Sequence, residues 1–162
     1  MHYLLYTSPV GPLRIVADNI GLRQLWLPNE VAARQPDSSW TEDANHPMIK
    51  HVVETLNSYF AGEPVSFDHI PCEPVGTEFQ RNVWAQLRTI RYAGVISYGD
   101  IAEQLNNPKA VRAVGGAVGR NPIAIILPCH RVLGRDNTLT GYSGGLDVKK
   151  ALLALEGINY KG

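Results

Sequence analysis

A proline-bearing segment near the middle of the chain constrains its fold more than any other feature of the sequence. The stretch EPVSFDHIPCEPVG contains Pro64, Pro71 and Pro74, and each proline pushes the residue before it out of helical dihedral angles. We therefore expect an extended linker here. We place the domain boundary at its end, which gives a first domain with its linker at residues 1–75 and a second domain at residues 76–162.

The first domain is predicted to be rich in β-structure. YLLYTSPVGPLRIVAD contains two apolar runs broken by SPVGP, which predicts a hairpin, and GLRQLWL predicts a third strand. Residues 28–46 are polar and show no period, so we expect a loop. HPMIKHVVETLNSYFAG then shows apolar residues at helical spacing and ends at Ala61 and Gly62, which predicts a helix.

The second domain is predicted to be mainly helical. GTEFQRNVWAQLRTI begins with Thr77 and has Gln80 three residues later, the pattern of a capping box. SYGDIAEQL has Ser97 at its start and predicts a second, shorter helix. The last helix, DVKKALLALEG, is expected to be capped by Asp147 and to end at Gly157.

A helix-turn-helix is predicted inside this second domain. Asn107 follows the second helix closely and is expected to cap a third, with Pro108 at its first position. Two short helices with so tight a join are typical of a helix-turn-helix. The fold class is therefore α/β, in the α+β sense: a β-rich N-terminal domain with a helix, followed by a mainly helical C-terminal domain.

The composition indicates a soluble, cytoplasmic protein. No apolar stretch approaches the ~20 residues of a membrane helix, and the N-terminus lacks the pattern of a signal peptide. The two cysteines, Cys72 and Cys129, are expected to be reduced. Neither has a Cys-x-x-Cys neighbour, so we expect no structural metal site.

The two halves of the chain differ in charge although the formal net charge of the whole is zero. Residues 1–75 hold 4 Lys/Arg against 9 Asp/Glu, and residues 76–162 hold 11 Lys/Arg against 6 Asp/Glu. A basic half is typical of a protein with a polyanionic partner. The alternative, an uneven distribution of solvated charges, is the one that charge alone favours.

The helix PKAVRAVGGAVG has an unusual composition. One side carries an apolar row of valines, and the other side carries Lys109, Arg112 and Gly116. Gly115 and Gly116 each cost ~1 kcal/mol relative to alanine in a helix interior, so another surface is expected to approach closely there. That surface is either a nucleic-acid groove, which Arg112 can enter, or another helix of the same protein.

The stretch ILPCHRVLG, residues 126–134, places a thiol, an imidazole and a guanidinium side by side. The run IAIIL before it is strand-sized and Pro128 ends it, so Cys129 is expected to begin a turn. The charge of Arg131 is expected to favour a thiolate. A cysteine nucleophile also needs a base and a group that orients the base. The candidates for these parts, and for holding the turn, are His130, Glu156 and Asn121.

Two functions of different classes are compatible with these residues. A Cys-His pair suits a hydrolase or an acyl-transfer enzyme, which turns over repeatedly. A buried, inert Cys129 suits a DNA-binding module that uses only its helix-turn-helix.

Several motifs together carry a resemblance to a known family. PCHRV is preceded by GRNPIAIIL and followed by GYSGGLDVKKALLALEG, and GTEFQRNVWAQL, ISYGDIAEQL and AVRAVGGA come before it in the chain. In this order the motifs resemble those of the O6-methylguanine-DNA methyltransferases, also called methylated-DNA–protein-cysteine methyltransferases. The resemblance covers most of residues 76–162, whereas residues 1–75 match only loosely. Arg91 stands where the family often has proline.

The resemblance implies direct-reversal DNA repair. Cys129 would accept the alkyl group of O6-alkylguanine irreversibly, once per molecule and without a metal or other cofactor, and O4-alkylthymine stays open as a second substrate. His130 would generate the thiolate through a water molecule, with Glu156 orienting the imidazole. Asn121 would brace the turn, and Tyr98 would donate a proton to the departing guanine.

The resemblance also assigns residues to the substrate pocket. Ser143 would donate a hydrogen bond to the guanine oxygen, and Tyr142 and Pro128 would wall the pocket. Gly144 would leave room for larger alkyl groups, and Lys149 would support the loop.

The implied partner is double-stranded DNA that carries the lesion, approached through the minor groove by a monomeric protein with no membrane contact. Arg112 would enter the duplex in place of the flipped nucleotide. The other DNA-contacting positions on the glycine-bearing helix would be Lys109, Ala113, Gly115 and Gly116.

Overall fold

The computed structural model describes all residues, 1–162, of the chain. The chain divides into two compact units. The N-terminal unit consists of residues 1–75 with residues 122–124, and the C-terminal unit consists of residues 76–121 and 125–162. No helix has the length and apolarity that crossing a bilayer requires.

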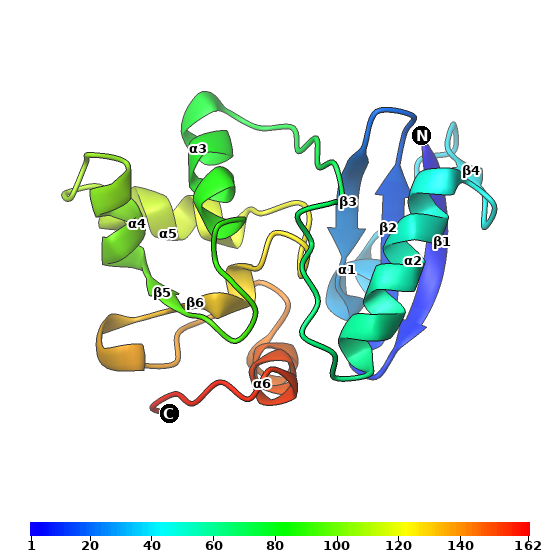
Figure 1. Ribbon diagram of the computed structural model, residues 1–162. Helices are drawn as coiled ribbons and strands as arrows, with labels where there is room; N and C mark the ends of the chain where they lie inside the picture. The colour runs from blue at the N-terminus through cyan, green and yellow to red at the C-terminus, as the bar shows by residue number, and fades with distance from the viewer. The chain divides into compact units, whose positions relative to one another are not determined.

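The N-terminal unit is built on a four-stranded sheet in the order β3-β2-β1-β4. The predicted hairpin is formed by β1 (His2–Ser8) and β2 (Gly11–Ala17), and the predicted third strand is β3 (Leu22–Trp26). The turn of the hairpin places Gly11 at φ 115°, a region that favours glycine. The predicted helix is α2 (Pro47–Phe60), which packs on β1 and β2 (Figure 1).

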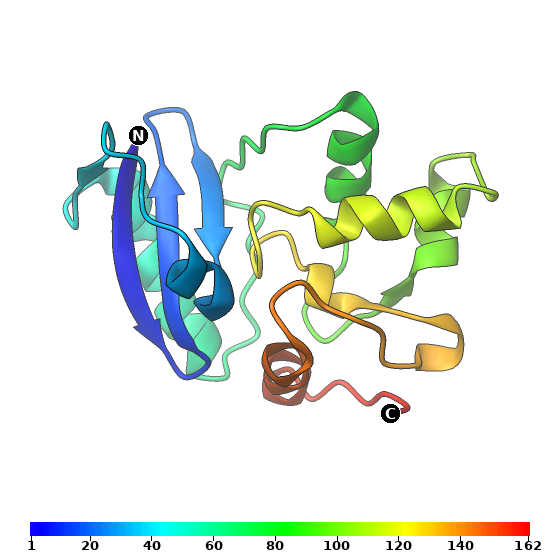
Figure 2. The same ribbon diagram turned by 180° about the vertical axis from the view of Figure 1, so that it is seen from behind.

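The prediction of a loop over residues 28–46 is wrong in two places. Pro28 begins a short helix, α1 (Pro28–Ala33), because proline at the first helical position is pre-organised for it. Residues further on form β4 (Thr41–Glu42), which pairs in parallel with the start of β1. Helix α1 lies on the side of the sheet opposite to α2 (Figures 1 and 2), so β2 is covered on both faces and its residues 15–17 are fully buried.

The C-terminal unit contains three helices that pack on one another: α3 (Glu78–Leu87), α4 (Tyr98–Gln104) and α5 (Val111–Gly119). The predicted capping box of α3 is present in full, with both Thr77 and Gln80 bonded. Ser97 caps α4 in the same way. The Trp84 Nε1 donates to the Ala117 carbonyl at 2.9 Å and joins α3 to α5. Helices α4 and α5 pack on one another and are joined by residues 105–110, which form turns, so the helix-turn-helix prediction is confirmed.

Two predicted helix starts are wrong. Asn107 and Pro108 do not open α5; they form a turn, closed by a bond from the Ala110 N–H to the Asn107 carbonyl, and the helix begins at Val111. Asp147 does not cap the last helix, α6 (Leu146–Leu155), because Gly145 occupies the cap position and Asp147 lies in the first turn. The predicted end of α6 at Gly157 is confirmed, and this residue has φ 72°.

A small parallel sheet and a short helical turn complete the C-terminal unit. The strands are β5 (Ile96–Ser97) and β6 (Val132–Leu133). A 3₁₀ turn over Cys129–Arg131 leads into β6 and contacts α6. A second 3₁₀ turn covers Arg135–Asn137.

Candidate active site

The segment before Cys129 is not the strand that its apolar residues suggest. Residues 123–127 form a bridge and turns, all buried, and Ile125 is held at φ 70°. That conformation is strained for a β-branched residue and persists only where surrounding contacts enforce it. One such contact is visible: the Asn121 Nδ2 donates to the Leu127 carbonyl at 2.7 Å. Periodicity alone cannot distinguish such a buried turn from a buried strand.

Cys129 begins the 3₁₀ turn, as expected, and lines a pocket of about 350 Å³. Its Sγ lies 3.9 Å from the Tyr142 hydroxyl. The rest of the lining comes from α4, α5 and the loop after the second 3₁₀ turn: Tyr98, Gly115, Val118, Gly119, Gly141, Tyr142 and Ser143. Cys129 is 4 % exposed, and this pocket gives access to it.

The imidazole of His130 is fully buried and bound to a carboxylate. Its Nε2 lies 2.6 Å from Glu156 Oε2, and Glu156 is itself the C-terminal cap residue of α6. An ionised carboxylate only accepts hydrogen bonds, so Nε2 carries the hydrogen. In the neutral ring Nδ1 is then the acceptor nitrogen.

Arg131 balances the buried charge of Glu156. Its Nε donates to Glu156 Oε1 at 2.8 Å and its Nη1 to the Ile90 carbonyl at 2.8 Å. The Ala93 N–H adds a third donor to the same carboxylate at 3.0 Å. Arg131 was expected to favour a thiolate, but its guanidinium is bound to Glu156 and the backbone, and the charge that lowers the pKa of Cys129 is that of Lys149.

Burial raises the pKa of the Cys129 thiol above its ordinary value. Hydrogen bonds with Asn121 and Tyr142 and the charge of Lys149 act in the opposite direction without overcoming it. The resting sulfur is therefore a neutral thiol at neutral pH, and it needs a base before it can attack.

Burial also lowers the pKa of His130, although its bond to Glu156 acts the other way. The charges of Arg131 and Lys149 lower it further. His130 is consequently neutral at neutral pH and is able to accept a proton, which is the state that a general base requires.

Lys149 is a fully buried amine in the middle of α6. Its Nζ donates to the Val132 carbonyl at 2.9 Å and to Thr140 Oγ1 at 3.1 Å. Thr140 Oγ1 in turn lies 2.9 Å from the Tyr98 hydroxyl. Burial lowers the pKa of Lys149 to about 8, because desolvation disfavours the charged form.

The two central glycines of α5 have different surroundings. A Cβ built on Gly115 would meet only the Tyr98 ring, at 3.8 Å, and one built on Gly116 would meet only the flexible end of Arg120. At Gly115 the neighbour is a side chain of the adjoining helix α4, whereas at Gly116 no other helix lies within contact distance, so helix packing does not explain Gly116. The predicted apolar row is correct for Val114 and Val118, which are buried, but Val111 is exposed.

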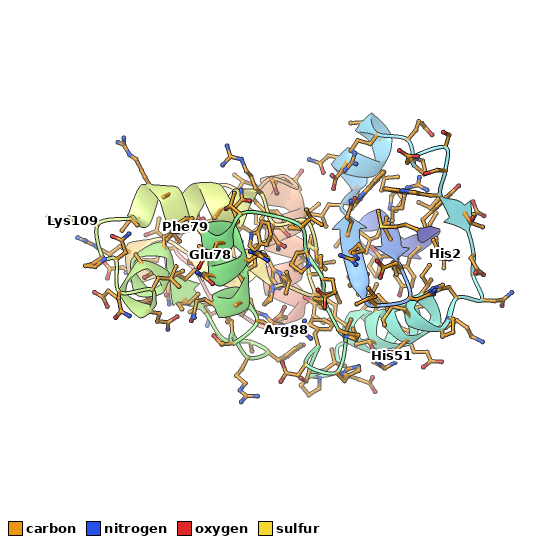
Figure 3. The ribbon with its side chains drawn as sticks, turned by 90° about the horizontal axis from the view of Figure 1, so that it is seen from above. His2, His51, Glu78, Phe79, Arg88 and Lys109 are labelled. Carbon is orange, nitrogen blue, oxygen red and sulfur yellow. The ribbon has the colours of Figure 1, made fainter.

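The bare face of α5 is exposed together with basic side chains. Arg112 and Ala113 are exposed on the first turn of the helix, and Lys109 is exposed in the turn before it. Figure 3 shows Lys109 on this loop, pointing away from the helices.

The structure brings most of the candidate residues together. Cys129, Tyr98, Tyr142, Ser143 and Gly115 line one pocket, with Asn121, His130, Glu156 and Lys149 around the cysteine turn. Pro128 and Gly144 are buried next to it and do not line the pocket. Arg91, where the family often has proline, lies in a turn closed by its carbonyl and the Gly94 N–H.

Sequence reasoning missed two side chains and one backbone group in the site: the ion-paired role of Arg131, the hydroxyl of Thr140 and the N–H of Ala93. A buried arginine needs a carboxylate partner, and this requirement could have joined Arg131 to Glu156. Nothing in the sequence distinguishes Thr140 from Thr138, the other threonine of its loop.

Comparison with known proteins gives a consistent picture over the whole chain. Residues 1–74 match the ribonuclease-like domain of 6-O-methylguanine DNA methyltransferase, and residues 78–158 match the DNA binding domain of 6-O-methylguanine DNA methyltransferase. A methylated-DNA–protein-cysteine methyltransferase of Haemophilus influenzae is 47% identical over 160 residues, which cover 99% of this chain and 88% of that protein. One of Methanosarcina acetivorans is 47% identical over 158 residues, covering 97% of this chain and 99% of the relative.

A solved structure agrees with these sequence matches. The crystal structure of Mycobacterium tuberculosis OGT in complex with DNA superposes with a TM-score of 0.87 at 45% sequence identity, covering 97% of this chain and 93% of that one. The cysteine turn, the buried His-Glu pair and the two matched domain models thus agree, and the chain belongs to the 6-O-methylguanine DNA methyltransferase family.

Proposed function

We propose that Cys129 is the residue that accepts the alkyl group when this protein repairs O6-alkylguanine in DNA. One observation carries the assignment: the thiol of Cys129 opens into a pocket, and the next residue is an imidazole locked to a buried carboxylate at 2.6 Å. The other cysteine, Cys72, belongs to the N-terminal unit and lines no such pocket.

The transfer begins with the removal of the thiol proton. A water molecule passes this proton to Nδ1 of His130, and Glu156 holds the ring through Nε2 and stabilises the imidazolium that forms. The sulfur then attacks the alkyl carbon, the bond from this carbon to guanine O6 breaks, and a thioether forms on Cys129. A thioether does not hydrolyse in neutral aqueous solution, so each protein molecule acts once.

The leaving guanine needs a proton to depart as a neutral base. Tyr98 lines the pocket together with Cys129 and supplies this proton from its hydroxyl. Ser143 binds the guanine oxygen and Tyr142 forms a wall of the pocket. Asn121 braces the strained turn through the Leu127 carbonyl.

The remaining assignments concern the shape of the site. Pro128 fixes the turn that Cys129 begins, and Gly144 leaves room in the following loop for larger alkyl groups. Lys149 supports that loop. O4-alkylthymine, which carries its alkyl group on a similar ring oxygen, is a second substrate for the same pocket.

DNA is bound through α5, with the helix in the minor groove of the duplex. The open face at Gly115 and Gly116 permits close approach, and Ala113 and Lys109 flank it. Arg112 enters the base stack and takes the place of the everted nucleotide, at a cost of a few kcal/mol for unstacking. We propose that the protein acts as a monomer in the cytoplasm.

The assignment is tested with duplex DNA that carries a radiolabelled methyl group on guanine O6. After incubation, the intact mass of the protein and a peptide map should show about one methyl per molecule, on Cys129, with no second round. Release of the label as a small product would support a hydrolase. Binding without any transfer would support a DNA-binding module.

The role of Arg112 is tested by comparing two substrates. Arg112→Ala should slow repair in duplex DNA by ~10-fold or more while leaving the reaction with free O6-benzylguanine nearly unchanged, because a free base needs no eversion. Lys150→Ala, on the exposed side of α6, is the control for a simple loss of charge. Equal losses with both substrates would contradict the assignment.

A further inference from the structure

Three polar groups from separate elements form a continuous hydrogen-bonded chain beside the pocket. Lys149 of α6 lies 3.1 Å from Thr140 Oγ1, and Thr140, in the loop before α6, lies 2.9 Å from the Tyr98 hydroxyl of α4. Only Tyr98 of the three lines the pocket. The chain therefore connects a buried amine to the wall of the pocket that also holds the cysteine.

The chemistry of the three groups sets the direction of the chain. An ammonium group only donates, so Thr140 Oγ1 accepts from Lys149. The hydroxyl hydrogen of Thr140 is then available to the Tyr98 oxygen. With that oxygen accepting, the hydrogen of Tyr98 is directed toward the pocket, where a leaving base would lie.

Lys149 is in a state that favours giving up a proton. Its side chain is fully buried and makes no salt bridge. Its Nζ faces three backbone carbonyls, those of Val132, Thr140 and Gly141. The Tyr142 ring, at 5.9 Å, and the Cys129 thiol are also near, and no carboxylate is among these neighbours. Burial of the charged amine lowers its pKa to about 8, which is within reach of the pH at which the protein works.

We propose that Thr140 is a positioning residue that relays a proton from Lys149 to Tyr98 while the guanine leaves. This inference rests on the proposed function, because it requires Tyr98 to donate to the base. The Tyr98 proton passes to the guanine nitrogen, the Thr140 proton passes to the Tyr98 oxygen, and a Lys149 proton passes to Thr140. The carbon–oxygen bond breaks as the carbon–sulfur bond forms, and the site is left with a neutral amine in place of a buried tyrosinate.

The test uses two substitutions at one position. Thr140→Val keeps the branched shape and loses the hydroxyl, whereas Thr140→Ser keeps the hydroxyl. The single-turnover rate of methyl transfer from duplex O6-methylguanine should fall ~10-fold in Thr140→Val, since general acid catalysis contributes at least that much. Thr140→Ser should retain most of the rate. Thr138→Val, which removes an exposed hydroxyl from the same loop, should have no effect.

A second substrate separates a relay from a purely structural effect. Iodomethane methylates a thiol with loss of iodide, a leaving group that needs no proton. Thr140→Val should therefore react with iodomethane at Cys129 as fast as the wild type does. A loss equal to that seen with methylated DNA would overturn the relay, because it would show that the substitution had disturbed the sulfur.

The ratio of wild-type to Thr140→Val rates should also depend on pH. This ratio should be largest below pH 8 and shrink above it. Lys149, with its pKa of about 8, loses its charge above that pH and then has no proton to pass to Thr140 in the wild type. A ratio that stays constant from pH 6.5 to 9.5 would count against the relay. Wild-type protein that moves no methyl group to Cys129 would refute the proposed function, whereas equal transfer by wild type and Thr140→Val would refute the relay alone.

Discussion

Glu156 is the residue on which the other buried polar groups of the site depend. It accepts from His130, from Arg131 and from the Ala93 N–H within 3.0 Å. The ion pair of Glu156 and Arg131 has no net charge. The buried carboxylate is therefore already balanced, and His130 does not need to be protonated to balance it. This is how a histidine 2.6 Å from a carboxylate can remain a base at neutral pH.

Arg131→Leu should show this balance in two measurements. Loss of one partner of a buried ion pair costs about 3–5 kcal/mol, which urea unfolding would detect. The pKa of His130 should rise, so the acid limb of the pH–rate profile, below the ordinary histidine range in the wild type, should move to higher pH. Arg135→Leu, in the exposed 3₁₀ turn, is the matched control. An unchanged acid limb in a folded Arg131→Leu protein would contradict the charge-balance explanation.

The two cysteines allow a clean test of the nucleophile. Cys129→Ala should abolish methyl transfer and leave DNA affinity within about twofold, because the thiol lies in the pocket and not on the exposed face of α5. Cys72→Ala should transfer at the wild-type rate. Mass spectrometry follows the transfer and fluorescence anisotropy follows the binding. Residual transfer by Cys129→Ala, with the methyl group on Cys72, would refute the assignment.

At the scale of single residues, the sequence indicated which residues would lie near Cys129 far better than the contacts among them. The family resemblance predicts that Glu156 acts together with PCHRV although it is distant in the sequence, and in the structure Glu156 binds His130 and Arg131 of this motif. The contacts of Arg131 with Ile90 and of Lys149 with Thr140 depend on how separate elements pack. No local pattern in the sequence encodes them.

At the scale of elements, the helix α5 has a locally unfavourable composition, which we expect to serve DNA binding. Its glycines cost helix stability, and within the protein only a tyrosine ring and a flexible arginine lie near them. For Gly116, which meets no other helix, we therefore expect the benefit of the missing side chain on the surface that would face DNA.

Gly116→Ala should weaken binding to DNA without lowering the stability of the fold. The free energy of unfolding should stay the same or rise by up to about 1 kcal/mol, because alanine is the better helix former and the added Cβ meets only Arg120 Nη1 at 3.1 Å. Affinity for duplex DNA should fall, since the methyl group holds the groove away. Thermal unfolding and a binding titration on the same sample test both parts. A more stable protein with unchanged affinity would show that the groove does not contact this face.

The elements themselves could be predicted where a local signal decides them. The predictions of the capping box of α3 and of the hairpin of β1 and β2 are confirmed, because side chains within a few residues specify them. The start of α5 was wrong because Asn107 and Pro108 suit a turn as well as a helix start. Residues 123–127 were wrong because Ile125 is held at a positive φ by the fold around it, against its own preference.

At the scale of the whole molecule, the two halves of the chain differ in charge as well as in fold. Lys and Arg are concentrated in residues 76–162, which include the matched DNA binding domain, and Asp and Glu prevail in residues 1–75. Attraction to phosphates should therefore come from the C-terminal unit. Such attraction weakens as salt rises, because each neutralised phosphate releases counterions.

Affinity for undamaged duplex DNA, measured across a range of salt concentrations, tests this division of charge. The logarithm of the association constant should fall linearly with the logarithm of the salt concentration. Lys109→Ala should make the slope shallower by about 0.9 if Lys109 neutralises one phosphate, and Lys50→Ala, an equally exposed lysine of α2, should leave it unchanged. Equal changes in both variants would mean that net charge alone governs binding, and a flat salt response in the wild type would remove phosphate contacts from the mechanism altogether.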